Sequence, residues 1–365
     1  MNRSVAVATP VLLIFLASAV CQGVSRAQVT AGPADLRDKL ERYLDQSAEA
    51  GFAFSALVSM DGRVIVQSGS GWLDSARTVR ATPRTLFNLA SITKSFTAVA
   101  VLMLREQGLL GLGDALTKFL ADVPKDKAAV TLEQLLLHTS GLGQNYLADG
   151  MAERDKAAAA ILRDPLKFPP GTGFSYSNEN YELLAAVIEV VSGRSYERYV
   201  RDNVLTRAGM ADTRFWDETA GLPPNAVAPM TRALEPANLG HNWGYIGSGG
   251  IYSNIVDLPR WFEALASGRL LNKNSLEMMW APRRQLTDTG VALGWFVSKA
   301  PDGTAEIWTR GSEDWGHNGV VRWFPARRTL VIVQSNSGER GDKNITANRS
   351  ISDGIVALLF DRRGL

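Results

Sequence analysis

The sequence predicts an α+β fold, with one antiparallel sheet built from both chain ends, flanked by helices, and a helical region inserted between the two parts. Short β-prone runs with turn residues between them occur near both termini. Between them the apolar residues recur at helical spacing. We therefore expect the sheet region at about residues 35–90 and 285–365, and the helical region at about residues 91–284. With 365 residues and 45% hydrophobic content, the chain can bury a full core.

The charge balance argues against a nucleic-acid partner. Lys and Arg number 39 and Asp and Glu number 37, which gives a formal charge of +2. Nucleic-acid binding usually needs a basic stripe or patch, and a chain with nearly equal numbers of basic and acidic residues gives no sign of one. With 21% charged and 8% aromatic residues, the composition also excludes a disordered or low-complexity chain.

Residues 1–27 have the layout of a secretory signal peptide. Arg3 precedes the apolar run Val5–Val20, and a small-residue site ends at Ala27. The alternative is a membrane anchor, but the run is shorter than the roughly 20 residues that a span needs. We expect cleavage after Ala27, no membrane span afterwards, and a periplasmic or secreted location. The only cysteine, Cys21, would be removed, so disulfides and thiol chemistry are not expected in the mature chain.

The first elements after the signal are predicted to be a helix and a hairpin. Apolar residues at helical spacing predict an amphipathic helix over about residues 34–50. Two apolar runs, Phe52–Ser59 and Arg63–Gly69, follow and are joined at Asp61-Gly62. An Asp-Gly pair between two such runs predicts a tight β-hairpin.

Helix signals dominate the middle of the chain. Ile92–Gln107 reads as a buried helix. Thr131 and Gln134 have the spacing of a capping box, which marks the start of another helix. Asn178 can cap a third helix, which Gly193 ends.

The pattern returns to strands after about residue 285 and closes with a helix. The short spacing between the last two strands predicts that they are antiparallel neighbours. The predicted elements are strands at Leu293–Val297, Ala305–Thr309, Gly316–Phe324 and Thr329–Gln334, and a helix at about Ile345–Phe360.

Ser91-Ile92-Thr93-Lys94 is the first group that can carry chemistry. Residues three apart share a helix face, so the Ser91 hydroxyl and the Lys94 amine can meet. A serine hydroxyl needs an adjacent base to act as a nucleophile, and a desolvated lysine can serve. The alternative is that Ser91 is a helix cap, because Ser-x-x-Lys also arises by chance.

Tyr176-Ser177-Asn178 is the second group. A tyrosine hydroxyl beside an ammonium can pass protons. The alternative is that Asn178 caps a helix and Tyr176 is a rim aromatic. The tripeptide recurs at Tyr252-Ser253-Asn254, and spacing alone does not choose between the copies.

His317-Asn318-Gly319 is the third group. A glycine near the start of a strand leaves room for a substrate to lie along it, and His317 could donate a hydrogen bond to that substrate. The alternative is a histidine at a strand end with no chemical role.

Taken in order, the three groups resemble the motif set of the penicillin-recognising serine hydrolases. That family includes class C β-lactamases, DD-peptidases and β-lactamase-like esterases. The resemblance covers about residues 35–360 and implies one such hydrolase domain over residues 28–365, with the α+β fold of the family. The segments that carry it are 86–98, 135–142, 168–193 and 249–254.

The resemblance implies an acyl-enzyme mechanism on Ser91. Lys94 and Tyr176 would move its proton, and Tyr176 takes this role rather than Tyr252 because it follows a Pro-Gly-Thr turn. Asn178 would hold Lys94 and contact substrate. No metal or organic cofactor is expected.

The resemblance also implies the rest of the cleft. His317 and Gly319 would contact substrate across from Ser91. The backbone N–H groups of Ser91 and Val320 would form the oxyanion hole.

A substitution in the third motif guides the expected substrate. His317 stands where β-lactamases carry a lysine, and a mostly neutral histidine attracts a carboxylate less. The sequence therefore favours a secreted serine hydrolase of an ester or a peptide-like amide, of D-amino-acid peptide or esterase type. The alternatives are a β-lactamase and, in another class, a noncatalytic penicillin-binding or envelope interaction protein. The oligomeric state is left open.

Overall fold

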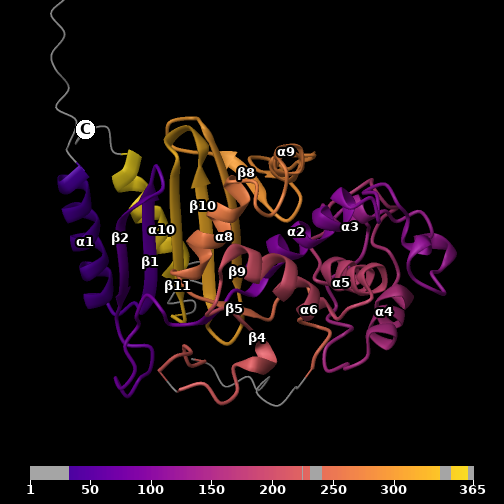
Figure 1. Ribbon diagram of the computed structural model, residues 1–365, viewed down its shortest axis with the longest axis horizontal. Helices are drawn as coiled ribbons and strands as arrows, with labels where there is room; N and C mark the ends of the chain where they lie inside the picture. The colour runs from indigo at the N-terminus through magenta and orange to yellow at the C-terminus, as the bar shows by residue number, and fades with distance from the viewer. Residues whose placement is uncertain (1–32, 224, 231–240, 338–346, 361–365) are drawn as a thin grey trace, which may run out of the picture.

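The computed structural model describes residues 33–223, 225–230, 241–337 and 347–360, so the predicted signal peptide lies outside the described residues. Its main feature is an eight-stranded antiparallel sheet with the order β2-β1-β11-β10-β9-β8-β7-β6 (Figure 1). Strands from both ends of the chain meet where β1 pairs with β11, which confirms the predicted architecture. The strands are β1 (Phe54–Met60), β2 (Arg63–Ser70), β6 (Arg284–Gln285), β7 (Gly290–Val291), β8 (Phe296–Lys299), β9 (Ala305–Ser312), β10 (Asn318–Phe324) and β11 (Thr329–Ser335).

Two terminal helices, α1 (Pro33–Glu49) and α10 (Ala347–Phe360), cover one face of this sheet. Leu40 and Leu44 of α1 and Ile355 of α10 pack with the inward-facing side chains of β1, β10 and β11. Burial of such apolar side chains is the main favourable term in folding. The predicted N-terminal helix is confirmed, and the predicted C-terminal helix is confirmed over the part that the structure describes.

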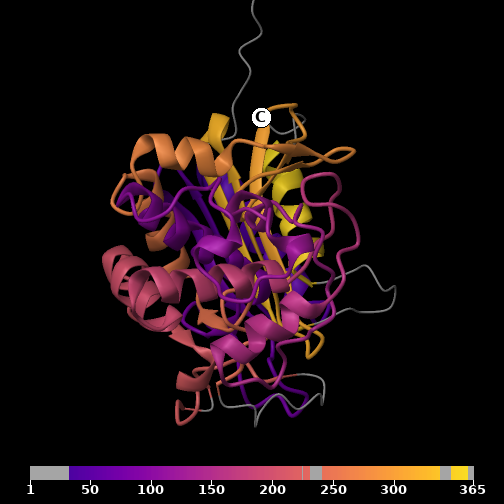
Figure 2. The ribbon, with the colours of Figure 1, turned by 90° about the vertical axis from the view of Figure 1, so that its right-hand side faces the viewer.

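The helical region lies against the other face and beyond one end of the sheet (Figures 1 and 2). The structure also has a second sheet, of order β3-β5-β4, which the sequence did not indicate. Its strands are β3 (Phe87–Asn88), β4 (Arg214–Phe215) and β5 (Ile251–Ser253). The helices are α2 (Thr93–Glu106), α3 (Leu132–Leu136), α4 (Arg154–Arg163), α5 (Glu179–Ser192), α6 (Tyr196–Val200), α7 (Thr206–Ala208), α8 (Asp257–Ala266) and α9 (Lys273–Trp280).

Local signals placed several elements correctly. The hairpin turns at Asp61 and Gly62, whose φ angles are +51° and +75°, as a tight hairpin turn requires. The capping box of Thr131 and Gln134 starts α3, and Gly193 ends α5 in the left-handed conformation.

One predicted strand begins three residues late. Leu293–Val297 was expected, but β8 starts at Phe296. Gly294 has a φ of +74°, and a Cβ there would lie 2.8 Å from the Cβ of Ala98. A tight turn against α2 therefore interrupts the apolar run, and hydropathy alone does not reveal that contact.

Helix α2 is the element that positions the site. It is buried between the sheet and α5, and the 3-10 turn Ala90–Ile92 that precedes it lies against β9. No helix among the described residues is long and apolar enough to cross a membrane.

Candidate active site

Ser91 is presented by a strained turn at the start of α2. Ala90 adopts a φ of +47°, which costs free energy for any residue with a Cβ. The side-chain oxygen of Asn88 accepts a hydrogen bond from Ala90 N–H at 2.6 Å and holds this turn. The turn leaves Ser91 partly exposed in the wall of a cavity, with Ile92 and Thr93 buried behind it.

Lys94 lies one helical turn after Ser91 and is only 3% exposed. Its Nζ donates to Ser91 Oγ at 3.0 Å, to Asn178 Oδ1 at 2.8 Å and to the Ser248 carbonyl at 2.8 Å. All three N–H donors of the amine are thus engaged, which fixes it beside the serine hydroxyl. The predicted meeting of Ser91 and Lys94 is present in the structure.

Asn178 differs from its expected role as a helix cap. It occupies the N-cap position of α5, but its side chain makes no capping hydrogen bond. Its side-chain oxygen instead accepts from Lys94 Nζ. The amide therefore links the first motif to the second, as the resemblance implies.

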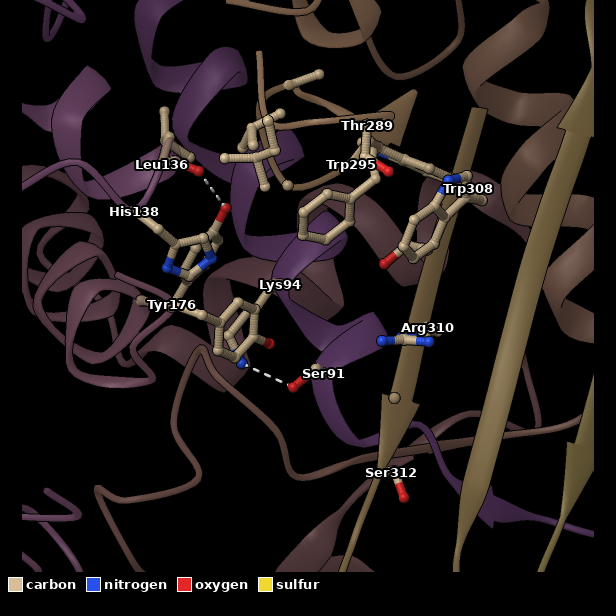
Figure 3. A pocket seen from close by; sticks show the side chains of 18 of the residues that line it. Ser91, Lys94, Leu136, His138, Tyr176, Thr289, Trp295, Trp308, Arg310 and Ser312 are labelled. Carbon is tan, nitrogen blue, oxygen red and sulfur yellow. Dashed lines mark hydrogen bonds between the residues drawn. The ribbon is translucent and has the colours of Figure 1, made fainter. Parts of the chain in front are cut away.

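Tyr176 faces the same amine across the cavity. Its ring centroid lies 5.1 Å from Lys94 Nζ and 4.4 Å from the ring of His138. Figure 3 shows Tyr176 and His138 on one side of Ser91, and Trp308, Arg310 and Ser312 along β9 on the other. His138 is a residue that our sequence reasoning did not single out.

His138 supports the segment that carries Tyr176. Its Nδ1 accepts a hydrogen bond from Ser177 N–H at 3.2 Å. Burial, and next the charge of Lys94, lower the pKa of His138 well below its usual value, so the ring is neutral at pH 7. A neutral imidazole with Nδ1 as acceptor fits this contact.

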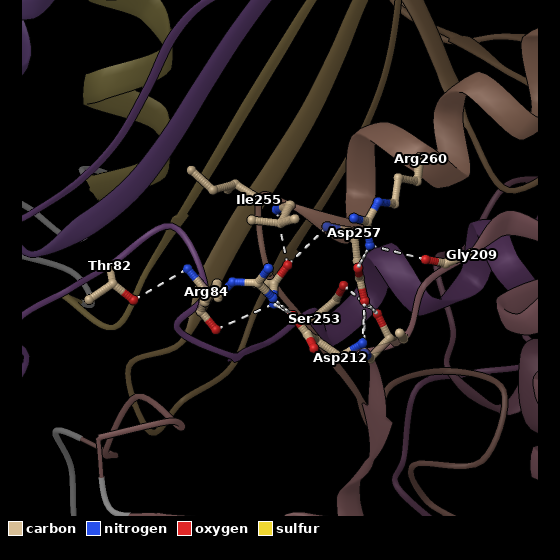
Figure 4. A network of polar contacts seen from close by, with 12 residues as sticks. Thr82, Arg84, Gly209, Asp212, Ser253, Ile255, Asp257 and Arg260 are labelled. Atoms are coloured by element: carbon tan, nitrogen blue, oxygen red, sulfur yellow. Dashed lines mark hydrogen bonds and ion pairs between the residues drawn. The ribbon is translucent and has the colours of Figure 1, made fainter.

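The second Tyr-Ser-Asn copy is part of the scaffold. Tyr252 is buried in β5, and burial raises the pKa of its hydroxyl above the usual range. Asn254 Oδ1 accepts from the N–H groups of Val256 and Asp257, as a cap of α8 would. Ser253 Oγ bonds to Thr213, within the polar network shown in Figure 4. Tyr252 does not line the cavity that holds Ser91.

The expectation that His317 faces the cleft is wrong. His317 has no exposed surface, and its ring packs between those of Phe87 and Tyr252. Its Nδ1 accepts from Asn88 N–H at 2.9 Å. Burial lowers the pKa of His317 to about 4. His317 therefore holds the backbone at Asn88, in the strand β3 that precedes Ser91, instead of contacting substrate.

Gly319 and Val320 are likewise one strand too far from the cleft. Both belong to β10, which pairs with β9 on one side and β11 on the other. Backbone donors in such a central strand are used by the sheet ladders. The expected oxyanion role of Val320 and the expected substrate contact of Gly319 are therefore not supported by their positions.

β9 is the strand that borders the cleft. Glu313 N–H donates to the His317 carbonyl at 2.8 Å, so the Glu313 N–H points toward β10. Successive residues of a strand alternate, so the Ser312 N–H points the opposite way, toward the open edge beside Ser91. In the part of the chain that the structure describes, β8 pairs with residues 305–308 of β9 and leaves the edge at residues 309–312 without a paired strand.

Gly311 permits the close approach of β9 to Ser91. A Cβ at this position would lie 2.2 Å from the Leu89 carbonyl oxygen and 2.7 Å from the Ser91 nitrogen. The glycine therefore lets β9 lie directly beside the Ser91 nitrogen. A basic residue followed by glycine, Arg310-Gly311, was visible in the sequence one strand before the tripeptide that we selected.

Replacing Gly311 with alanine should separate β9 from the Ser91 turn. The clashing atoms are backbone atoms, so the strand must shift, and overpacking of this kind costs about 1–3 kcal/mol. We expect a lower Tm and loss of the Ser91 labelling described below. Gly113→Ala is the control, because no atom lies within 4 Å of a Cβ there. Equal Tm and labelling in the two variants would contradict the close approach.

The cavity has an apolar part and a cationic part. Its volume is about 560 Å³. Phe296 and Trp308 stack at 4.7 Å and form an apolar wall. Arg310 and Arg349 also line the cavity, and neither has a carboxylate partner among the described residues. Burial and then the neighbouring Arg349 lower the pKa of Arg310, which indicates that the two cations lie close together.

The chain is similar in sequence to known proteins over most of its length. The Beta-lactamase family profile matches residues 36–354. The protein PbpX of Bacillus subtilis (strain 168) is 29% identical over 305 residues, which are 83% of this chain and 74% of PbpX.

Two solved structures are similar in fold. The octameric penicillin-binding protein homologue from Pyrococcus abyssi has a TM-score of 0.75 and 26% identity, covering 89% of this chain and 77% of that one. The D-amino acid amidase from Ochrobactrum anthropi SV3 has a TM-score of 0.75 and 22% identity, covering 90% of this chain and 99% of that one. With its sheet, its helical region and a profile match over most of its length, the chain belongs to the Beta-lactamase family of penicillin-recognising serine hydrolases.

Proposed function

We propose that this protein is a serine hydrolase that forms an acyl-enzyme on Ser91 and hydrolyses an ester or a peptide-like amide. The observation that carries the proposal is the 3.0 Å hydrogen bond between Lys94 Nζ and Ser91 Oγ in a cavity wall. A serine with an adjacent, oriented base is the arrangement that nucleophilic catalysis requires. Asn178 supplies the third, orienting group.

The reaction takes two steps. Ser91 Oγ forms a bond to the substrate carbonyl carbon, and its proton passes to the Lys94–Tyr176 pair. The same pair delivers the proton to the leaving amine or alcohol as the carbonyl bond to it breaks. Water then attacks the carbonyl carbon of the acyl-enzyme and loses a proton to the pair. The bond between that carbon and Ser91 Oγ breaks, the pair returns the proton to Oγ, and the acid leaves.

The N–H groups of Ser91 and Ser312 form the oxyanion hole in this proposal, in place of the expected Ser91 and Val320. Support comes from Gly311, which lets β9 lie directly beside the Ser91 nitrogen, and from the direction of the Ser312 N–H. Such donors aimed at the developing oxyanion are worth about 3 kcal/mol each in acyl-transfer enzymes.

The experiment that tests the proposal is labelling combined with a substrate panel. The purified protein is treated with a fluorophosphonate probe and assayed with p-nitrophenyl esters, D-alanyl peptides, D-amino acid amides and nitrocefin. Labelling with turnover of an ester or amide supports the proposal. A noncatalytic binding protein would show neither turnover nor a labelled Ser91.

β-Lactamase action is the second candidate, and the two arginines favour it. The expectation of weak carboxylate attraction rested on His317, which is buried away from the cleft. Arg310 and Arg349 instead provide cationic groups in the cavity. Guanidinium groups suit carboxylates because they can bind both oxygens.

Replacing Arg310 with glutamine should lower acylation by carboxylate-bearing substrates. Hydrogen bonds to charged groups contribute about 1.5–3 kcal/mol, so we expect about a tenfold or larger loss in kcat/KM for benzylpenicillin relative to a neutral aryl ester. Arg63→Gln, on the exposed edge strand β2, is the control. An unchanged ratio between the two substrates in folded Arg310→Gln protein would show that Arg310 does not contact the carboxylate.

We also propose that the protein is exported, with residues 1–27 removed. The support is the sequence alone: a basic start, a short apolar run and a small-residue site. Mass spectrometry of the protein purified from the periplasm or medium of an expressing bacterium tests this, and a mature chain that begins at Gln28 is expected. A cytoplasmic product that retains Met1 or Asn2 would contradict it.

A further inference from the structure

Glu313 is a partly buried carboxyl group that none of the steps above uses. It follows Ser312 directly, at the end of the strand that borders the cleft. Among the described residues its carboxylate has no hydrogen-bond or ion-pair partner, although other carboxylates in the fold are paired. A half-buried carboxyl group without a protein partner calls for an explanation.

The backbone around Glu313 brings its carboxylate close to the Ser248–Gly249 segment, which contacts Lys94. Side chains two residues apart along a strand share a face, so Glu313 lies on the same face as Gly311. That face of Gly311 contacts the Ser91 turn. A Cβ on Gly249 would lie 3.5 Å from Glu313 Oε1. Gly249 adjoins Ser248, whose carbonyl accepts from Lys94 Nζ.

Lys94 is nevertheless not the partner of Glu313. Its three donors are directed at Ser91, Asn178 and Ser248. Burial raises the pKa of Glu313 to about 8, although the charge of Lys94 opposes this, and Asp314 and Asp149 add to the rise. A further cation near Glu313 would therefore gain an acceptor that the free protein leaves unused.

We propose that Glu313 binds a primary ammonium group of the substrate, next to the carbonyl that Ser91 attacks. The N–H of the preceding residue, Ser312, is directed toward the carbonyl oxygen in the proposed mechanism. The amine of an α-amino acyl group lies two bonds from that carbonyl carbon. The substrate class is then an ester or amide of an amino acid with a free α-amine, rather than an N-acylated one.

This inference rests on the proposed function, because it assigns the acyl group that Ser91 receives. The amine and the Glu313 carboxyl can form a hydrogen bond in two ways: an ammonium donates to a carboxylate, or a protonated carboxyl donates to a neutral amine. An N-acetyl group removes the charge, leaves one N–H donor in place of the three of an ammonium group, and makes the nitrogen bulkier.

The experiment measures hydrolysis of the benzyl thioesters of D-alanine and of N-acetyl-D-alanine by the mature protein, which begins at Gln28. We expect the wild type to prefer the free amine. Glu313→Gln should lower kcat/KM for the free amine by about tenfold or more, because a hydrogen bond between charged groups is lost. The value for the N-acetyl substrate should change by less than about twofold, and Glu313→Asp should restore part of the preference.

Glu49→Gln is the matched control, because it makes the same substitution at an exposed position at the end of α1. It should leave the preference unchanged. An equal loss on both substrates in Glu313→Gln would overturn the proposal and indicate a role in proton transfer. No preference for the amine, or no turnover of either thioester by protein whose Ser91 labels, would also overturn it. Failure of Ser91 to label at all would instead reject the proposed hydrolase function.

Discussion

Replacing Ser91 with alanine should abolish acylation with every substrate that the wild-type protein turns over. The variant lacks the oxygen that forms the acyl bond, and no other hydroxyl is hydrogen-bonded to Lys94 Nζ among the described residues. Lys94→Ala should cost nearly as much, because residues that act as a unit are strongly non-additive. Initial rates with the best ester or amide of the panel measure both effects.

The control for this pair is Ser95→Ala, which removes a hydroxyl from the same helix. Ser95 Oγ donates to the Ile92 carbonyl at 2.6 Å and does not line the cavity. This variant should keep most of the wild-type rate. Wild-type turnover by a folded Ser91→Ala protein would refute the assignment of the nucleophile.

Tyr176→Phe should lower turnover by about a hundredfold or more, as expected for loss of a general acid–base group. The substitution removes only the phenolic oxygen, so the ring contacts with His138 and Lys94 are kept. The rate should therefore fall without a matching change in Tm. Steady-state kinetics together with thermal unfolding separate the two effects.

Tyr252→Phe is the matched control, because it makes the same change in the other Tyr-Ser-Asn copy. Tyr252 is 2% exposed, and its ring packs against those of Trp216 and His317. Removing one buried hydroxyl group changes stability by about 1 kcal/mol, so a small change in Tm with a near-normal rate is expected. The reverse pattern in the two variants would show that the catalytic tyrosine had been placed in the wrong segment.

Features set by neighbouring residues were predictable from the sequence. The Asp61-Gly62 turn and the capping box at Thr131 depend on a few consecutive residues, and both are present. The pairing of Ser91 with Lys94 was also predictable, because helix geometry alone brings residues three apart together.

The strand that borders the cleft was not predictable in the same way. Both β9 and β10 carry a basic residue near a glycine, at Arg310-Gly311 and at His317-Asn318-Gly319. Which of two antiparallel neighbours lies next to Ser91 depends on tertiary packing. The glycine contact that decides it, between Gly311 and the Ser91 turn, joins segments about 220 residues apart.

The choice between the two Tyr-Ser-Asn copies shows the same limit. Each tripeptide precedes a helix, α5 or α8, so local pattern treats them alike. They differ in what the asparagine contacts. Asn178 Oδ1 accepts from Lys94 Nζ, whereas Asn254 Oδ1 accepts from the backbone N–H groups of Val256 and Asp257 at the start of α8. Resemblance to a family favoured Tyr176 where spacing could not.

The most direct test of the central claim is to locate the covalent adduct. The protein is incubated with a fluorophosphonate probe, digested with trypsin and analysed by mass spectrometry with fragmentation. Cleavage after Arg84 and Lys94 releases the peptide of residues 85–94, which contains Ser91. We predict one adduct per chain, on Ser91, and none in Ser91→Ala. An adduct on another residue, or an unmodified peptide 85–94 in protein that turns over an ester or amide, would contradict the assignment of Ser91 as the nucleophile.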